Sequence, residues 1–306
     1  MYDLIIVGGG PAGVGAGVYA ARKKINTLII VENFGGQSVV SADIQNWIGT
    51  RSVSGIELAK ALEEHLRAQE EIEILEGERA TGVSKIDGGF RVETNKGKNF
   101  DTKTVLVASG SRRRRLGVPG GDKFDGLGVA YCSICDAPVF KNKDVAVVGV
   151  GNAGLEAVVD LLSYATRIYL LGHSGTLKGD PMTQERIKND PKVQIILGAE
   201  PEEIIGDSFV TALRYKEVAS GAIKEISVQG VFVEIGIIPN SELVKDLVQI
   251  NQLGEIVVDP RTQRASAEGV WAAGDVCDGL YRQNNISAGD AIKAVLNIYD
   301  YLTSFG

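Results

Sequence analysis

The fold of this chain is decided by the stretch Leu4-Ile5-Ile6-Val7-Gly8-Gly9-Gly10-Pro11-Ala12-Gly13, an apolar strand that enters a glycine-rich turn. An Ala-rich helix is expected after the turn, and a second apolar strand over residues 27–31 ends on Glu32. Such a unit is typical of dinucleotide binding, because the glycines let the backbone approach a pyrophosphate that the helix N-terminus attracts. Glu32 stands at about the spacing of a ribose-binding carboxylate. We therefore predict a dinucleotide here; the alternative is a tight structural turn beside a solvated Glu32.

The same pattern occurs a second time, as Val145-Ala146-Val147-Val148 followed by Gly149-Val150-Gly151-Asn152-Ala153-Gly154. A helix to about Tyr164 and a strand over residues 167–171 complete the second copy. Two copies of this unit predict an α/β protein with two Rossmann-like, three-layer nucleotide-binding domains.

Two short glycine-bearing strands are the expected links between the domains: residues 104–108 before Ser109-Gly110, and residues 231–235 before Gly236. After Pro239 the chain is expected to return to the first domain, so the second domain is predicted to be inserted into the first. The predicted boundaries are residues 1–111 and 241–306 for the first domain and residues 112–240 for the second.

The bulk composition describes an ordinary soluble protein, with 44% hydrophobic and 23% charged residues. The net charge of -7 argues against a protein that coats nucleic acid, because such binding relies on clustered Lys and Arg. No apolar run approaches the ~20 residues of a membrane-spanning helix. The chain also begins directly with a strand, so no leader segment is expected. We therefore predict a cytoplasmic protein that binds neither nucleic acid nor membrane.

The cysteines favour redox chemistry, since two of the three form the motif Cys132-Ser133-Ile134-Cys135. Such a pair lies within disulfide reach and opens and closes reversibly. The alternative is two buried, inert cysteines. Zinc would need further ligands, and the only histidines are His173 and a His65 that is expected to be solvated, so no metal is predicted. Cys277 is expected to be a small packing residue rather than a third redox thiol.

Four motifs stand in the order Gly35-Gly36-Gln37, Asn46-Trp47, Cys132-Ser133-Ile134-Cys135-Asp136 and Ala272-Ala273-Gly274-Asp275. In this order the chain resembles, over essentially its whole length, the low-molecular-weight thioredoxin reductases and the related flavoprotein part of alkyl hydroperoxide reductases. The resemblance implies FAD in the first domain, with Gly274-Asp275 at the ribityl chain and Arg282-Gln283 near the isoalloxazine. Asn284 departs from the small residue usual at its position. The expected FAD-binding residues are Gly8, Gly10, Pro11, Ala12, Gly13, Glu32, Gly36, Gln37, Asn46, Gly110, Gly274, Asp275, Arg282, Gln283 and Asn284.

The resemblance also implies roles around the dithiol. Cys135 would exchange electrons with the flavin, Cys132 would attack the disulfide of a partner protein, and Asp136 would donate or accept the proton. Nucleophilic attack of this kind needs a thiolate. The resemblance further implies a homodimer, and a second domain that rotates to present the dithiol to flavin and partner in turn.

The electron donor stays open at the level of sequence. Gly149, Gly151, Asn152 and Gly154 predict a nicotinamide dinucleotide in the second domain. However, Gly172 occupies roughly the position where NAD recognition uses a carboxylate, and no basic cluster for the 2′-phosphate of NADPH follows it. Three donors remain: NADH or NADPH bound weakly through other residues, a deazaflavin, or ferredoxin. The glycines would then serve either a nucleotide or strand–helix packing alone.

The leading functional prediction is a reductase that passes electrons through FAD to Cys132 and Cys135 and on to thioredoxin or a glutaredoxin-like protein. One alternative is the reducing arm of a peroxiredoxin system, which normally carries an extra N-terminal thioredoxin-like region; because this chain begins with the FAD strand, a separate partner protein is expected. Two further candidates are a non-catalytic flavin redox sensor and a ferredoxin-NADP reductase. Residues 112–115, four consecutive arginines, either dock an acidic partner such as ferredoxin or thioredoxin or form a solvated linker.

Overall fold

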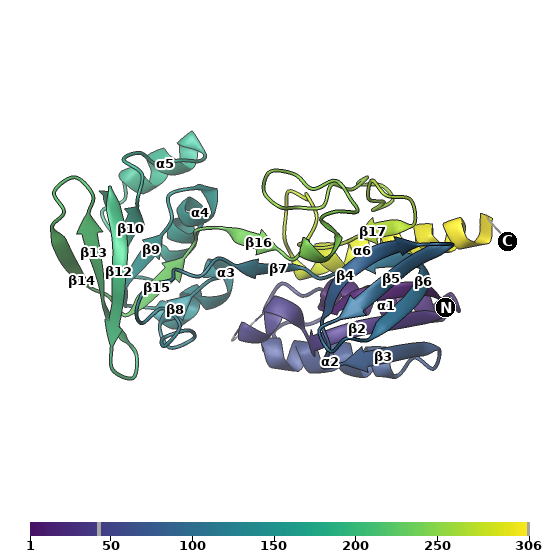
Figure 1. Ribbon diagram of the computed structural model, residues 1–306. Helices are drawn as coiled ribbons and strands as arrows, with labels where there is room; N and C mark the ends of the chain where they lie inside the picture. The colour runs from purple at the N-terminus through teal and green to yellow at the C-terminus, as the bar shows by residue number, and fades with distance from the viewer. Residues whose placement is uncertain (42–43, 305–306) are drawn as a thin grey trace. The chain divides into compact units, whose positions relative to one another are not determined.

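The computed structural model describes residues 1–41 and 44–304, and the chain divides into two compact units. Unit 1 comprises residues 1–112 and 238–306, and unit 2 comprises residues 113–237. The chain passes between the units twice. The two connecting strands, β7 (Ser111–Arg113) and β16 (Ile237–Pro239), pair with each other as a two-stranded ribbon (Figure 1).

Unit 1 is built on a seven-stranded sheet in the order β3-β2-β1-β6-β5-β4, with β17 also paired to β6. The strands β1, β2, β3, β6 and β17 run parallel, whereas β5 and β4 extend the sheet as an antiparallel hairpin. Their bounds are β1 (Tyr2–Gly9), β2 (Thr27–Phe34), β3 (Ile72–Glu76), β4 (Ala80–Ile86), β5 (Gly89–Thr94), β6 (Asn99–Val107) and β17 (Val270–Ala272).

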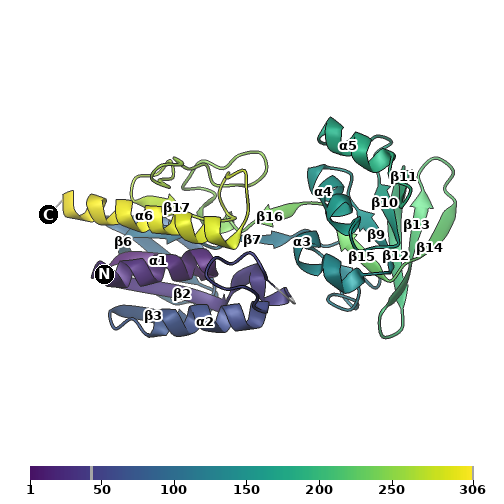
Figure 2. The same cartoon turned by 180° about the vertical axis from the view of Figure 1, so that it is seen from behind.

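Successive residues of β1 point to opposite faces of this sheet, so each face has its own apolar core. Leu4 and Ile6 pack with the helices α1 (Pro11–Arg22), α2 (Gly55–Arg67) and α6 (Asn284–Ser304) (Figure 2). Ile5 and Val7 pack on the other face, with the segment that carries η3 (Glu242–Val244). The short helix η1 (Gly36–Val40) follows β2. Burial on both faces explains why β1 is a continuous apolar run.

Unit 2 is a second three-layer unit on a parallel five-stranded sheet in the order β11-β10-β9-β15-β8. Val145 and Val147 pack toward the helical layer, and Ala146 and Val148 pack toward the antiparallel sheet β12-β13-β14. The element bounds are β8 (Val129–Ala130), α3 (Ser133–Asp136), η2 (Ala137–Phe140), β9 (Asp144–Val148), α4 (Asn152–Leu161), β10 (Arg167–Gly172), α5 (Pro181–Lys188), β11 (Val193–Leu197), β12 (Ala199–Gly206), β13 (Val210–Glu217), β14 (Ile223–Ser227) and β15 (Gly230–Val233). The predicted α/β architecture with two Rossmann-like units is confirmed.

In each unit a glycine loop leaves the carboxyl end of the first strand and enters a helix, β1 to α1 and β9 to α4. Ligands of parallel α/β sheets bind at this edge of the sheet. None of the helices in the described ranges is both long and apolar enough to cross a membrane.

Candidate functional site

Of the three glycines of the Gly-x-Gly-x-x-Gly pattern in the first loop, packing of the chain requires the first and third but not the second. A Cβ at Gly8, where φ is +120°, would collide with the carbonyl oxygen of Ala108, and one at Gly13 would collide with that of Gly8. A Cβ at Gly10 would meet only the backbone of Gly36, at 3.8 and 4.0 Å, which is ordinary van der Waals contact, and the φ of −78° suits any residue. The space beside Gly10 is therefore not needed for packing, as expected where a backbone must lie against a pyrophosphate.

Several predicted FAD-binding residues outside this loop are held by side-chain hydrogen bonds within unit 1. The Asn46 amide donates to Gln283 Oε1 at 3.0 Å, and the Ser38 hydroxyl donates to Asn284 Oδ1 at 3.0 Å. Asn284, the residue that departs from the resembled pattern, therefore ties η1 to the first turn of α6. Gln37 Nε2 donates to Ser111 Oγ at 3.0 Å, at the beginning of β7.

Two further predicted FAD-binding residues, Gly274 and Asp275, lie beside α1 and α6. Gly274 has a φ of +79°, and a Cβ there would lie 3.2 Å from both Ala12 and Ser287. Ser287 in turn donates to Asp275 Oδ1 at 3.2 Å. The structure thus brings the glycine loop, the Gly274-Asp275 turn and the start of α6 together at one edge of unit 1. Gly110 has a φ of +65°, and a Cβ there would meet nothing within 4 Å.

Arg282 forms an ion pair with a buried acidic residue that was not predicted from the sequence. Its guanidinium pairs with Glu255, whose side chain is only 8% exposed and also accepts from Asn251 Nδ2 at 2.6 Å. Within the described ranges the buried Nε of Arg282 has no hydrogen-bond partner. An unsatisfied buried donor beside the predicted flavin residues fits a bound group that supplies the acceptor.

The second glycine loop repeats the first in its backbone requirements. A Cβ at Gly149 would collide with the Glu234 carbonyl oxygen, and one at Gly154 would collide with that of Gly149. Gly151 again differs, since a Cβ there would have nothing within 4 Å and its φ is −87°. Packing therefore accounts for the first and third glycines of this loop and leaves Gly151 as the position that suits a nucleotide. The Asn152 side chain is used internally, because its Oδ1 accepts from the backbone of Asp180 at 2.8 Å.

The strand registers correct the position assigned to the ribose-binding carboxylate in unit 2. Val7 pairs with Ile30, two residues before Glu32, and Val148 pairs with Leu171, two residues before His173. His173, which is exposed, thus corresponds to Glu32, and Gly172 corresponds to Val31. The spacing in the sequence agrees with this register, because Gly8 and Glu32 are 24 residues apart and so are Gly149 and His173. Gly172 lies one residue short of that position.

The dithiol lies in unit 2 on α3 and the residue before it, and Cys132 and Cys135 form a disulfide with Cα atoms 5.4 Å apart. Both cysteines are half-buried, and Ile134 between them is 63% exposed, so the turn is open to a partner. This exposure argues against the alternative of two buried, inert cysteines. Burial raises the pKa of Asp136 to about 6, against a smaller lowering by Arg113. A carboxyl of this kind exchanges protons near neutral pH.

Neither Cys277 nor His65 lies on a partly exposed turn like that of the dithiol. Cys277 is buried in the core of unit 1, where burial and surrounding carboxylates raise the pKa of its thiol well above the usual value. The packing role predicted for it therefore fits the structure. His65 lies exposed in the last turn of α2. No group of three or more His, Cys, Asp or Glu side chains in residues 1–41 and 44–304 is arranged to hold a metal ion.

The arginine run is largely offset by carboxylates of the chain itself. Arg112 lies 2.7 Å from Glu242, and Arg115 lies 2.6 Å from Asp122. Arg113 lies 3.9 Å from Glu234. These pairs favour an internal role for the run over the docking of an acidic partner.

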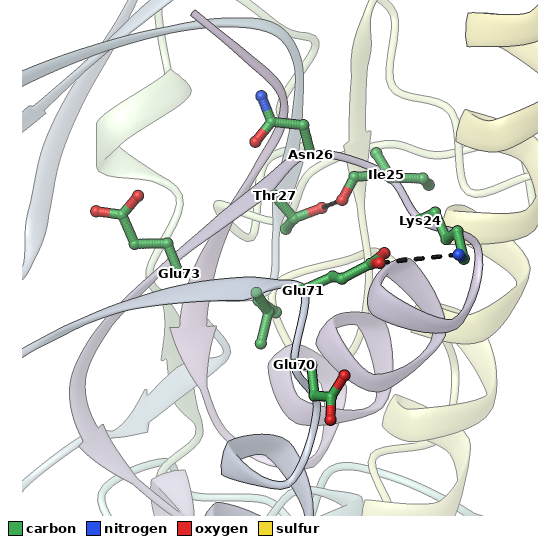
Figure 3. A pocket seen from close by; sticks show the side chains of 8 residues that line it. Lys24, Ile25, Asn26, Thr27, Glu70, Glu71 and Glu73 are labelled. Carbon is green, nitrogen blue, oxygen red and sulfur yellow. Dashed lines mark hydrogen bonds and ion pairs between the residues drawn. The ribbon is translucent and has the colours of Figure 1, made fainter.

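A surface hollow of about 570 Å³ lies away from the predicted chemistry (Figure 3). It is lined by residues 24–27 and 70–73, at the amino ends of β2 and β3, and Lys24 and Glu71 face each other across it at 3.8 Å. The first glycine loop lies at the opposite edge of the sheet, after the carboxyl end of β1. We assign the hollow no role.

Comparison with known proteins identifies the family of the chain. A sequence model of the family described as "Pyridine nucleotide-disulphide oxidoreductase" matches residues 2–291. The chain is 39% identical over 301 residues to an alkyl hydroperoxide reductase subunit of Staphylococcus epidermidis, covering 98% of this chain and 59% of that protein. It is 40% identical over 301 residues to a Bacillus subtilis protein named "NADH dehydrogenase", covering 98% and 58%.

Among solved structures, the thioredoxin reductase of Streptococcus pyogenes matches with a TM-score of 0.87 and 32% identity, covering 100% of this chain and 99% of that one. The predicted resemblance is therefore confirmed. The chain spans about three fifths of the length of the two curated relatives.

Proposed function

Because this chain belongs to the pyridine nucleotide-disulphide oxidoreductase family, we propose that it is a disulfide reductase that transfers electrons through FAD to Cys132 and Cys135 and on to a protein disulfide. The observation that carries the proposal is the Cys132–Cys135 disulfide on a partly exposed turn, followed directly by Asp136. A dithiol that cycles needs access for a partner disulfide and a nearby proton donor, and this turn has both.

Family membership implies FAD and a nicotinamide nucleotide. FAD supplies two-electron transfer between a hydride donor and a dithiol. In unit 1 we assign its binding to the Gly8–Gly13 turn, the Gly274-Asp275 turn and the Asn46–Gln283 pair. The open space beside Gly10 and the unsatisfied Nε of Arg282 support this assignment.

For the nicotinamide nucleotide we favour the second glycine loop as the binding site. Gly151 supports this choice, because the chain packing around it does not require a glycine. The exposed His173, in place of a carboxylate, gives no basis for choosing NADH over NADPH. Ferredoxin and deazaflavin are the rival donors, and flavin bleaching distinguishes them.

Three residues of unit 2 have separate roles in the proposed thiol chemistry. Cys132 attacks the partner disulfide as a thiolate, Cys135 closes the internal disulfide and releases the reduced partner, and Asp136 holds the proton that is exchanged. These roles rest on the family resemblance. Because the pKa of Asp136 is raised to about 6, both its protonated and ionised forms are accessible near neutral pH.

We propose a thioredoxin or a thioredoxin-like or glutaredoxin-like protein as the acceptor, in line with the similarity to the Streptococcus pyogenes thioredoxin reductase. A second candidate is a peroxiredoxin system, which the 39% identity to the Staphylococcus epidermidis alkyl hydroperoxide reductase protein favours. Both acceptors present a protein disulfide to the same dithiol.

Anaerobic flavin bleaching tests the proposal. FAD-loaded protein is mixed with NADH, NADPH, a reduced deazaflavin or reduced ferredoxin, with and without oxidised thioredoxin. We expect bleaching by a nicotinamide nucleotide and reoxidation of the flavin when thioredoxin is added. Bleaching by ferredoxin or the deazaflavin alone would assign the donor differently, and bleaching without any transfer to thioredoxin or to a peroxiredoxin-linked disulfide protein would overturn the reductase proposal.

A further inference from the structure

Glu234 is a buried carboxyl that the proposed chemistry does not use. It follows β15 directly, and its backbone N–H donates to Val148 at the carboxyl end of β9. Its side chain is 7% exposed, and one oxygen lies 3.9 Å from Arg113 Nη1. Carboxyls at this depth are rare unless they are paired or hydrogen-bonded, so the position calls for a physical reason.

The contacts of Glu234 lead to the dithiol. Its carboxylate is hydrogen-bonded by the backbone N–H of Ser133, the residue directly after Cys132. The Ser133 hydroxyl donates to Asp160 Oδ2 at 2.7 Å. Ser133 is therefore held by carboxylates from two different elements, one after β15 and one on α4, and the turn that carries both sulfurs is fixed through it.

One guanidinium acts on two carboxyls of this region, the buried side chain of Glu234 and the half-buried Asp136. Burial is the main cause that raises the pKa of Glu234 to about 7, and burial likewise raises that of Asp136 to about 6. Arg113, from β7, lowers both pKa values. Glu156 and Asp160 on α4 raise that of Glu234, and the Ser133 N–H lowers it. The charge next to the dithiol turn thus changes within the physiological pH range.

We propose that Glu234 and Arg113 are positioning residues that set the thiolate fraction of the reduced Cys132–Cys135 pair, with Glu234 suppressing the thiolate and Arg113 favouring it. The inference rests on the proposed function in that these cysteines are the working dithiol. Its physical basis is that a negative charge beside a thiol disfavours loss of the thiol proton to solvent, and a positive charge favours it. The dithiol would therefore become a poorer nucleophile as Glu234 ionises.

The test is the pH profile of iodoacetamide alkylation on the reduced, FAD-loaded chain, read by mass spectrometry of the peptide that carries both cysteines. Glu234→Gln keeps an amide oxygen that accepts from Ser133 and removes the charge. We expect it to lower the apparent pKa of the reactive thiol and to raise the alkylation rate at pH 7.5 roughly threefold or more, since half a pKa unit is about a factor of three. Arg113→Gln, at a half-exposed position, should shift the profile in the opposite direction by a similar factor.

Glu200→Gln, at an exposed position of β12, is the matched control and should leave the profile unchanged. Opposite shifts in the two variants support the proposal, because loss of packing alone would not change sign with the charge removed. Unchanged profiles, or shifts in the same direction, would overturn it. Reduction of thioredoxin is measured separately on the same samples, so that absence of the proposed reductase activity is distinguished from absence of this electrostatic effect.

Discussion

The two glycine loops have the same backbone and different side chains at one contact. In unit 1, Gly9 lies against Val31, where a Cβ on Gly9 would collide with the valine. In unit 2 the small and large residues are exchanged, because Val150 in the loop lies against Gly172 at the end of β10. A Cβ on Gly172 would collide with both methyl carbons of Val150. The small and large residue have changed places across the same contact.

This exchange shows which part of a glycine motif reports on a ligand. The first and third glycines of both loops are required by the carbonyl oxygens of the chain itself, so their presence in unit 2 says little about a nucleotide. Gly10 and Gly151 are not required in this way. The register adds that unit 1 presents Glu32 where unit 2 presents His173. The units are thus alike in how they fold and different in what they can recognise.

The largest expected effect distinguishes flavin reduction in unit 1 from disulfide reduction by the dithiol of unit 2. Cys132→Ser should lower thioredoxin reduction by a factor of roughly 10³ or more, because the attacking thiolate is removed. Bleaching of the flavin by its donor should persist, since unit 1 is unchanged. Steady-state turnover and anaerobic absorbance measure the two steps, with Cys277→Ser as a control expected to leave turnover near its original rate. Retained turnover in Cys132→Ser would contradict the assignment of the dithiol.

The next effect tests the two unrequired glycines side by side. Gly10→Val should reduce FAD retention about tenfold or more, and Gly151→Val should raise the KM for the nicotinamide nucleotide about tenfold while FAD stays bound, because each side chain fills the space for a pyrophosphate. Flavin content after gel filtration and donor titration measure these changes. If Gly151→Val leaves the KM unchanged, the second loop is a packing motif only.

A smaller effect examines the exchanged contact. Gly172→Val should destabilise the chain by about 2 kcal/mol through overpacking against Val150. Adding Val150→Gly should recover most of that loss, because it reproduces the Gly9–Val31 contact of unit 1. Urea unfolding of the single and double variants measures the coupling. An equal loss of unfolding free energy in the single and the double variant would show that Gly172 and Val150 do not share this contact.

The smallest expected effect concerns nucleotide choice. His173→Glu places a carboxylate where Glu32 stands in unit 1 and should shift the ratio of kcat/KM for NADH over NADPH toward NADH by about tenfold, because the carboxylate accepts from the ribose 2′-hydroxyl and repels a 2′-phosphate. His173→Gln, which changes the same exposed side chain without adding a carboxylate, serves as the control and should leave the ratio near its original value. An unchanged ratio of kcat/KM for NADH over NADPH would mean that other residues select the nucleotide.

Much of the architecture follows from patterns that are local in the chain. The apolar runs at residues 4–7 and 145–148, each directly before a glycine turn, predict two buried parallel strands and the helices that follow, because strand burial and turn geometry are encoded within a few residues. The Cys132–Cys135 motif likewise predicts its own disulfide. The prediction from sequence was wrong at Gly172, because a spacing of 23 residues from Gly149 was matched to the 24 residues between Gly8 and Glu32, and the equivalent residue is His173.

The sequence by itself determined the two Rossmann-like units, the redox pair and the family resemblance, since each depends on residues that are close together in the chain. Only the tertiary structure decided which glycines serve packing, that Glu255 pairs with Arg282, and that Arg113 and Ser133 both lie near Glu234. These partners are far apart in sequence and carry no local signal. Their burial and charge depend on which strands and loops the fold places in contact, and that information exists only after the chain has folded.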